Sequence, residues 1–258
     1  MSRMLSHGAF QGVAFLVLLL VLWEAAVWLF GIRQFLLPAP SVIIAELLNY
    51  PSFFARQGAY TLLTTLIGFA IALVLGVVFA IGIVYSRLLE NTLYALLVAL
   101  NSIPKVALAP LFVIWLGTEM APKIAIAVTI AIFAIVVDMV LGLRSADPEM
   151  INMARSARAT EWQILRKIRL PNALPSLFAG MKVAISFALV GALVGEFVAG
   201  SRGLGHAILI GQGMFDTPRV FASILVLGVM GTLLFYLVDL GEKLALPWHA
   251  SQRGNRSH

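Results

Sequence analysis

Long apolar runs dominate this sequence of 258 residues, of which 61% are hydrophobic and only 12% are charged. A bilayer core about 30 Å thick is crossed by about 20 apolar residues in helical conformation. So few charges exclude a soluble globular protein, because an ordinary soluble domain has roughly 25% charged residues. We therefore predict an all-α integral membrane protein with about six transmembrane helices, at residues 11–32, 60–85, 92–116, 122–143, 172–198 and 218–241.

Prolines and small polar clusters mark where this helical pattern is interrupted. The third span contains Pro104 and Pro110, so we expect it to be broken or re-entrant, since proline lacks a backbone N–H and clashes with the preceding turn. Residues 37–41, with the sequence LPAPS, predict a rigid turn in which Ser41 caps a short helix over residues 42–48 on the outer surface.

The chain is predicted to be one transmembrane domain over residues 1–258. It comprises a membrane bundle at 11–245, a cytosolic segment at 147–170 and a polar tail at 246–258. With the N-terminus in the cytosol, eleven of the 18 Lys and Arg residues lie in cytosolic segments and five in outer segments. Short loops rich in Lys and Arg remain in the cytosol, so both termini are predicted to be cytosolic.

The motifs that the sequence lacks exclude several kinds of chemistry. There is no cysteine, which rules out disulfides and thiolate metal sites. No G-x-x-x-x-G-K-[ST] phosphate loop occurs, so any ATP would bind another chain. The four histidines are too scattered for a metal site or catalytic triad. We expect a protein that is not an enzyme and binds no cofactor.

The long cytosolic connection at residues 144–170 predicts two short helices. Asp147 is a good N-cap and Pro148 suits the first helical position. Thr160 and Gln163 have the spacing of a capping box, which begins a second helix that we expect to end near Pro171. The two helices should therefore meet near residues 158–159.

The first of these helices places Ile151, Ala154 and Ala157 on one side, beside Arg155 and Arg158. Two interpretations remain open from this pattern. The helix could pack its small apolar side on its own membrane domain. Alternatively, it could form a knob that inserts into a groove of a separate cytosolic protein, with the arginines making charge-assisted contacts.

Residues 152–171, NMARSARATEWQILRKIRLP, resemble the cytoplasmic E-A-A loop of bacterial ABC-importer permeases. Three positions depart from that pattern, because Asn152, Met153 and Arg158 stand where the family has Glu, Ala and Gly. The positions that match are Ala154, Ile168, Leu170 and Pro171.

The resemblance extends over about residues 36–245 and is strongest to the permeases of nitrate, sulfonate, taurine and bicarbonate importers. The stretches that match, in order, are 37–41, 102–104 with 107–110, 142–145 with 147–149, and 203–205 after Glu196. It implies a subunit of the bacterial cytoplasmic (inner) membrane that pairs with a second copy, two ATPase subunits that bind ATP and Mg²⁺, and an extracytoplasmic solute-binding protein. The implied solute is a small anion such as nitrate, a sulfonate or taurine. The alternative is a self-sufficient channel or an ion-coupled secondary carrier.

The resemblance also implies that residues 149–160 form the coupling helix that docks on the ATPase. Asn152 cannot offer the negative charge of the family's glutamate. Arg158 would strain the turn by about 1 kcal/mol if that turn requires a positive φ. The residues predicted to dock are Glu149, Asn152, Ala154, Arg155, Ala157, Arg158, Ala159 and Thr160.

Polar and ionisable residues inside the spans are candidates for the solute pathway, because such groups are costly in lipid. Asp138 and Lys182 are expected at similar depth, either as an ion pair joining two helices or as part of a gate. Lys105, in the broken third span, is expected on a cavity wall where it would favour anions, unless Glu196 neutralises it. Asn101 and Ser102 are its expected polar neighbours. Glu24 is expected to be structural, and residues 200–205 to form a bend.

Overall fold

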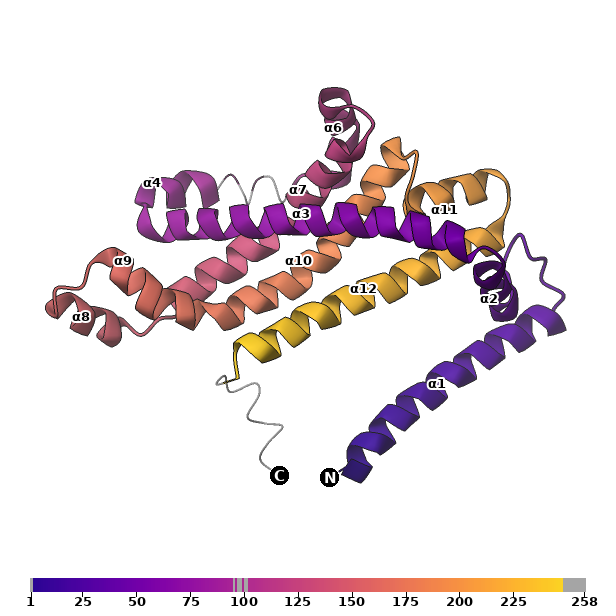
Figure 1. The fold of residues 1–258 in the computed structure, drawn as a ribbon, viewed down its shortest axis with the longest axis horizontal. Helices are drawn as coiled ribbons and strands as arrows, with labels where there is room; N and C mark the ends of the chain where they lie inside the picture. The colour runs from indigo at the N-terminus through magenta and orange to yellow at the C-terminus, as the bar shows by residue number, and fades with distance from the viewer. Residues whose placement is uncertain (1, 95, 97–98, 100–101, 248–258) are drawn as a thin grey trace.

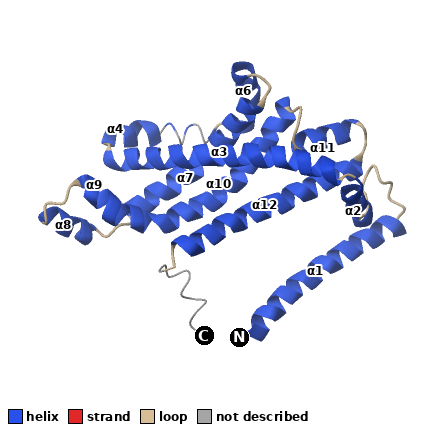
Figure 2. Cartoon of the chain, in the orientation of Figure 1, coloured by secondary structure: helices blue, strands red, loops and turns tan. Residues whose placement is uncertain are grey.

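A computed structural model describes residues 2–94, 96, 99 and 102–247. Within these residues all regular elements are helices, joined by short connections (Figure 2). The prediction of an all-α protein is therefore confirmed for the described part of the chain. Most of the predicted polar tail, residues 248–258, lies outside it.

Four helices are long and apolar enough to cross a bilayer. They are α3 (Pro51–Tyr85), α7 (Met120–Arg144), α10 (Leu170–Ala199) and α12 (Thr217–Ala245), and they contain the predicted spans 60–85, 122–143, 172–198 and 218–241. Helices α3, α7 and α10 pack against one another, and α12 runs along α10 (Figure 1).

The predicted first and third spans have a different form. Helix α1 (Ser2–Leu29) diverges from the bundle and meets it only near α2 (Figure 1). The third span, predicted at residues 92–116, is described as short pieces, namely the end of η1 (Glu90–Tyr94), η2 (Lys105–Leu108) and α6 (Ala109–Leu116). The short helix α4 (Arg87–Leu89) directly precedes η1. The expected break lies at Pro104, which directly precedes η2. Pro110 lies in the first turn of α6, where a backbone N–H would have no partner within the helix, so this proline does not interrupt it.

The prediction that Ser41 caps the short outer helix is wrong. Helix α2 (Pro40–Asn49) begins at Pro40 and its N-cap is Ala39. The Ser41 hydroxyl instead donates to Glu24 Oε1 at 2.7 Å, and the Ser41 backbone N–H donates to Glu24 Oε2 at 3.0 Å. Glu24 thus ties α1 to α2, as its expected structural role requires.

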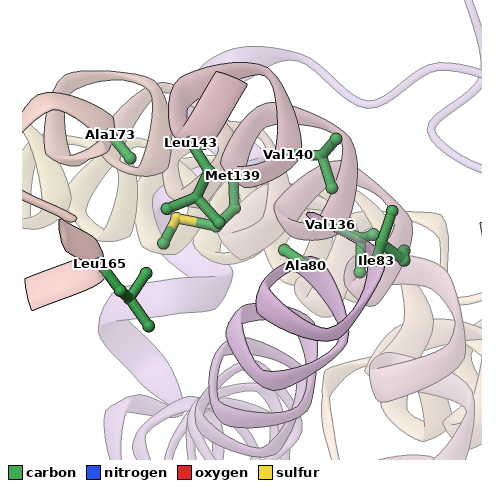
Figure 3. Close-up of a cluster of buried hydrophobic side chains, with 8 residues drawn as sticks. All are labelled: Ala80, Ile83, Val136, Met139, Val140, Leu143, Leu165 and Ala173. Atoms are coloured by element: carbon green, nitrogen blue, oxygen red, sulfur yellow. The ribbon is translucent and has the colours of Figure 1, made fainter. Parts of the chain in front are cut away.

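Small residues allow the three central helices to approach closely. Gly68 and Gly76 of α3 lie against Ala127 and Ile135 of α7. In a membrane, helices associate through such close packing, because lipid provides no hydrophobic drive between them. At the end of the bundle where α7 connects to α10 there is a larger apolar cluster, which includes Leu165, just before α10 (Figure 3). Its buried members are Ala80, Ile83, Val136, Met139, Val140, Leu143, Leu165 and Ala173.

We predict that Gly191→Ala destabilises the bundle by about 1–3 kcal/mol, the usual cost of overpacking. A Cβ at Gly191 would lie 2.5 Å from the Ala127 Cα, so α7 and α10 would have to separate. Thermal unfolding in detergent should show a lower midpoint. Gly228→Ala in α12 is the matched control, because a Cβ there meets nothing within 4 Å. Equal midpoints for the two variants would contradict the close contact.

Candidate functional site

The connection between α7 and α10, predicted above to be cytosolic, folds into a compact unit, here called the cytosolic knob (residues 145–164). It contains α8 (Pro148–Ser156) and α9 (Glu161–Ile164). The Asp147 side chain accepts from the Glu149 N–H at 2.8 Å. Thr160 and Gln163 form the reciprocal capping box, with distances of 2.8 and 3.3 Å. Both predicted helix starts are confirmed.

The turn between the two helices is strained in the way that the sequence suggested. Arg158 has a φ of +58°, in the left-handed region that favours glycine. The Ala159 N–H donates to the Ala154 carbonyl at 3.0 Å and closes the turn. The position at which the related permeases have glycine therefore does need a positive φ in this chain.

The second helix of the knob does not end near Pro171, and that expectation is wrong. Helix α9 continues through the π-helical turn η3 (Leu165–Arg169) directly into α10. A π turn immediately before the proline accommodates the hydrogen bond that Pro171 cannot make. The Arg169 guanidinium also donates to the Leu143 carbonyl at 3.1 Å. The knob is thus joined to α7 at one end and is continuous with α10 at the other.

The apolar side of α8 packs on the protein itself. Ile151 is buried with Ala146 and Ile164, and Ala154 and Ala159 are half-buried against them. Ile151 and Ala154 thus pack mainly within the knob, whereas Ala157, predicted on the same side, is exposed. The other residues predicted to dock on a partner are exposed, namely Glu149, Asn152, Arg155, Ala157, Arg158 and Thr160.

The outer surface of the knob presents three large apolar side chains that the sequence analysis did not single out. Met150, Met153 and Trp162 are exposed, although they lie on a cytosolic segment. Arg155 and Glu161, also exposed, form an ion pair at 3.0 Å between the two helices. Met150 and Met153 lie outside the side of α8 that Ile151 and Ala154 form. Their position relative to that side is the sequence signal that could have identified them as exposed.

The charged residues inside the bundle pair differently from the prediction. Lys182 contacts Asp239 and Glu242 of α12, each at 2.5 Å. The expected ion pair between Lys182 and Asp138 is therefore wrong, because the rotation of α10 turns Lys182 toward α12. The sequence analysis did not identify Asp239 and Glu242 of α12 as partners, although they lie three residues apart near the end of the last apolar run.

The residues around the broken third span are only partly described. Asn101 lies outside the described residues, and Ser102 is exposed. The Lys105 ammonium lies 5.6 Å from the centre of the Phe133 ring. The described ion pairs include none between Lys105 and Glu196, so the expected neutralisation of Lys105 by Glu196 is not found.

Glu196 instead organises a buried polar cluster at the opposite end of α10 from the knob. Its carboxylate accepts from the Thr61 hydroxyl and from the Gly205 N–H, each at 2.8 Å. The Thr61 oxygen in turn accepts from the Leu204 N–H at 2.9 Å, which holds the start of α11 (Leu204–Gly213) on α3. Burying a carboxylate is costly unless such donors surround it.

The bend at residues 200–205 is confirmed, and its glycines have a physical reason. Gly203 has a φ of +106°, and a Cβ there would lie 2.2 Å from the Glu196 carboxyl carbon. The Gly203 N–H donates to Gln57 Oε1 at 2.6 Å. Lys123, fully buried in α7, adds positive charge near Glu196 and donates to the Thr118 and Glu119 carbonyls. We call Glu196, Thr61, Gln57, Lys123 and Gly203–Gly205 the Glu196 cluster.

We predict that Glu196→Ala lowers stability, because the Thr61 hydroxyl and the Gly205 N–H would lose their acceptor inside the bundle. Each unsatisfied buried group costs about 1–3 kcal/mol. Thermal unfolding in detergent should show a clear loss for Glu196→Ala and a smaller one for Glu196→Gln, which keeps an amide oxygen as acceptor. Equal losses for the two variants would contradict the hydrogen-bonding role.

Residues 72–245, well over half of the chain, match the protein family described as binding-protein-dependent transport system inner membrane component. The chain belongs to this family. It is therefore a permease subunit of an ABC transporter, and the family resemblance stated above is confirmed.

Individual permeases are similar over nearly the whole chain. The riboflavin transport system permease protein RibX of Chloroflexus aurantiacus is 38% identical over 238 residues, 92% of this chain and 89% of that one. The formylaminopyrimidine transport permease protein ThiX of Halalkalibacterium halodurans is 33% identical, over 96% and 99% of the two chains. The putative aliphatic sulfonates transport permease protein SsuC of Bacillus subtilis is 27% identical, over 96% and 91%.

A solved structure shares the fold of this permease. The crystal structure of an amino acid ABC transporter with histidines has a TM-score of 0.64 and 16% sequence identity. The match covers 77% of this chain and 97% of that one. At this identity the likeness concerns the fold alone.

Proposed function

We propose that this permease is the translocation subunit of an ATP-driven importer for a small solute. Two copies would form the passage, two separate ATPase subunits would bind the cytosolic knobs, and an extracytoplasmic solute-binding protein would deliver the solute. The observation that carries this proposal is the knob, a capped and rigid protrusion that continues into α10 without a break. A force applied to it reaches the membrane helices directly.

The surface of the knob supports a protein partner in the cytosol. Exposed Met150, Met153 and Trp162 are apolar enough to bury area in a groove. Methionine adapts its shape to such surfaces, and tryptophan is enriched in protein interfaces. Arg155 and Arg158 surround them with charge for the rim of the contact. ATP and Mg²⁺ would bind the ATPase, and this chain would bind no cofactor.

The proposed arrangement in the membrane follows from the same features. With the knob in the cytosol, α7 and α10 both have their knob ends inside, and both termini are cytosolic in the bacterial inner membrane. Apolar side chains of α1 are exposed over residues 15–22, so this part of the helix can pack on a second copy. Six spans in all would then be formed by α1, the broken third segment and the four long helices.

The proposed cargo is a small planar heterocycle. Two relatives above 30% identity are named for riboflavin and formylaminopyrimidine, both of which contain a flat nitrogen ring. A second candidate is a small anion such as nitrate, a sulfonate or taurine. It is favoured by Lys105 beside the broken third segment and by the more distant similarity to SsuC. Membership of a family that depends on binding proteins argues against a self-sufficient channel or secondary carrier.

We predict that Met153→Glu weakens binding of the ATPase subunit at least about tenfold, since a charge would enter an apolar groove. Co-purification and titration of the ATPase against the detergent-solubilised permease would measure it. Met214→Glu is the matched control, because Met214 is similarly exposed, 71% against 70%, but lies at the end of α11, away from the knob. Equal binding by both variants would contradict docking at the knob.

Uptake by proteoliposomes that contain the permease, its ATPase and its binding protein tests the cargo. We expect ATP-dependent uptake of labelled riboflavin or formylaminopyrimidine and none of taurine. Uptake of taurine alone would favour the anion. Uptake by the permease without the ATPase would contradict the proposed function as a whole.

A further inference from the structure

One intramembrane acid has a different environment from the others. Glu196 is held by hydrogen bonds, Asp239 and Glu242 pair with Lys182, and Glu24 accepts from Ser41 and Trp28. Among the residues that the structure describes, none donates a hydrogen bond to the Asp138 carboxylate or forms an ion pair with it. The Lys182 ammonium, which was expected to pair with Asp138, forms its ion pairs with acids of α12 instead.

Asp138 lies on α7 at its contact with α10. Gly180 of α10 is directly opposite, and a Cβ there would lie 3.0 Å from Asp138 Oδ2. The glycine therefore makes room for the carboxylate, which is only half-buried. A carboxylate that is neither paired nor fully buried requires a polar surrounding, because exposure to lipid costs several kcal/mol.

The surface beside Asp138 is apolar and open. Leu141 follows it by about one turn on α7, and Val183 and Phe187 follow Gly180 by about one and two turns on α10. All three side chains are exposed. Because α7 and α10 run antiparallel, Leu141 lies on one side of Asp138 along the helix pair, and Val183 and then Phe187 lie on the other. Asp138 is thus a single hydrogen-bond acceptor within a strip of exposed apolar side chains.

We propose that Asp138 contacts the solute during translocation, accepting hydrogen bonds from ring or amino N–H groups while the ring lies against the neighbouring apolar side chain of Leu141 or Val183. This inference rests on the proposed importer function and makes its cargo more specific. A carboxylate repels anions and accepts from N–H donors. The pathway therefore selects a heterocycle with N–H donors at its edge over a nitrate-like or sulfonate-like anion.

The absence of cysteine from the sequence allows a direct test of water and solute access. In the assembled transporter, Asp138→Cys should react with a charged, membrane-impermeant thiol reagent, and riboflavin or formylaminopyrimidine should slow that reaction. Taurine should not. Val74→Cys is the control, because Val74 is exposed on α3, where lipid is expected, and should not react. An unreactive Asp138→Cys would mean that lipid or the second copy covers this face, and would overturn the proposal.

Transport kinetics separate a solute contact from a structural role. With labelled riboflavin or formylaminopyrimidine, Asp138→Ala should raise the KM for uptake about tenfold or more. Asp138→Asn, which keeps one acceptor oxygen and nearly the same shape, should raise it less. ATPase binding by both variants is measured alongside, so that a loss of assembly is separated from a change in KM.

The outcomes distinguish this proposal from the function on which it rests. If the wild-type transporter takes up a heterocycle and both variants keep its KM, Asp138 does not contact the solute and only this inference fails. An equal loss of assembly in both variants would mean that Asp138 is structural, which also overturns it. If the wild-type transporter takes up neither heterocycle, the proposed cargo and this inference fail together.

Discussion

The close contact between α7 and α10 is the interaction on which the rest of the structure depends. Glycines lie along its length, with Gly142 near the cytosolic end, Gly180 opposite Asp138, and Gly191 and Gly195 at the other end. Lipid does not drive helices together, so the stability of the pair comes from the fit of these small residues. Both features proposed for function are attached to this pair. The cytosolic knob joins its helices at one end, and the Glu196 cluster fixes the other.

This arrangement suggests how movement is transmitted. Arg169 ties the base of the knob to the last turn of α7, and η3 continues into α10. At the far end, Lys123 of α7 and Glu196 of α10 lie in the same buried cluster, which also holds α11. Flexible joints are therefore few between the knob and α11. In the proposed importer, a displacement of the knob would therefore move the helix pair as one body, with Asp138 near its middle.

The sequence predicted those features that depend on neighbouring residues. The caps at Asp147 and Thr160 involve partners two or three residues away, and the strain at Arg158 follows from one turn. Four of the six predicted spans are likewise long apolar helices, because length and composition suffice to predict these.

Features that depend on helix rotation or on distant packing were not predictable in the same way. Lys182 pairs with α12 rather than with Asp138, since the choice depends on how α10 is turned. Ser41 donates to Glu24, 17 residues earlier, instead of capping its own helix. Ile151 is buried by Ile164, so exposed methionines form the outer surface of the knob.

The most direct measurement is the distance between spin labels on one copy of the permease in the assembled transporter. Labels would be placed at Ser156→Cys in the knob and Gln212→Cys in α11, both exposed positions. Double electron–electron resonance would measure the distances between the labels without nucleotide and with bound ATP. Rigid coupling predicts that the distance within one copy stays constant while the distance between the Gln212→Cys positions of the two copies changes. A change within one copy as large as that between copies would contradict the account.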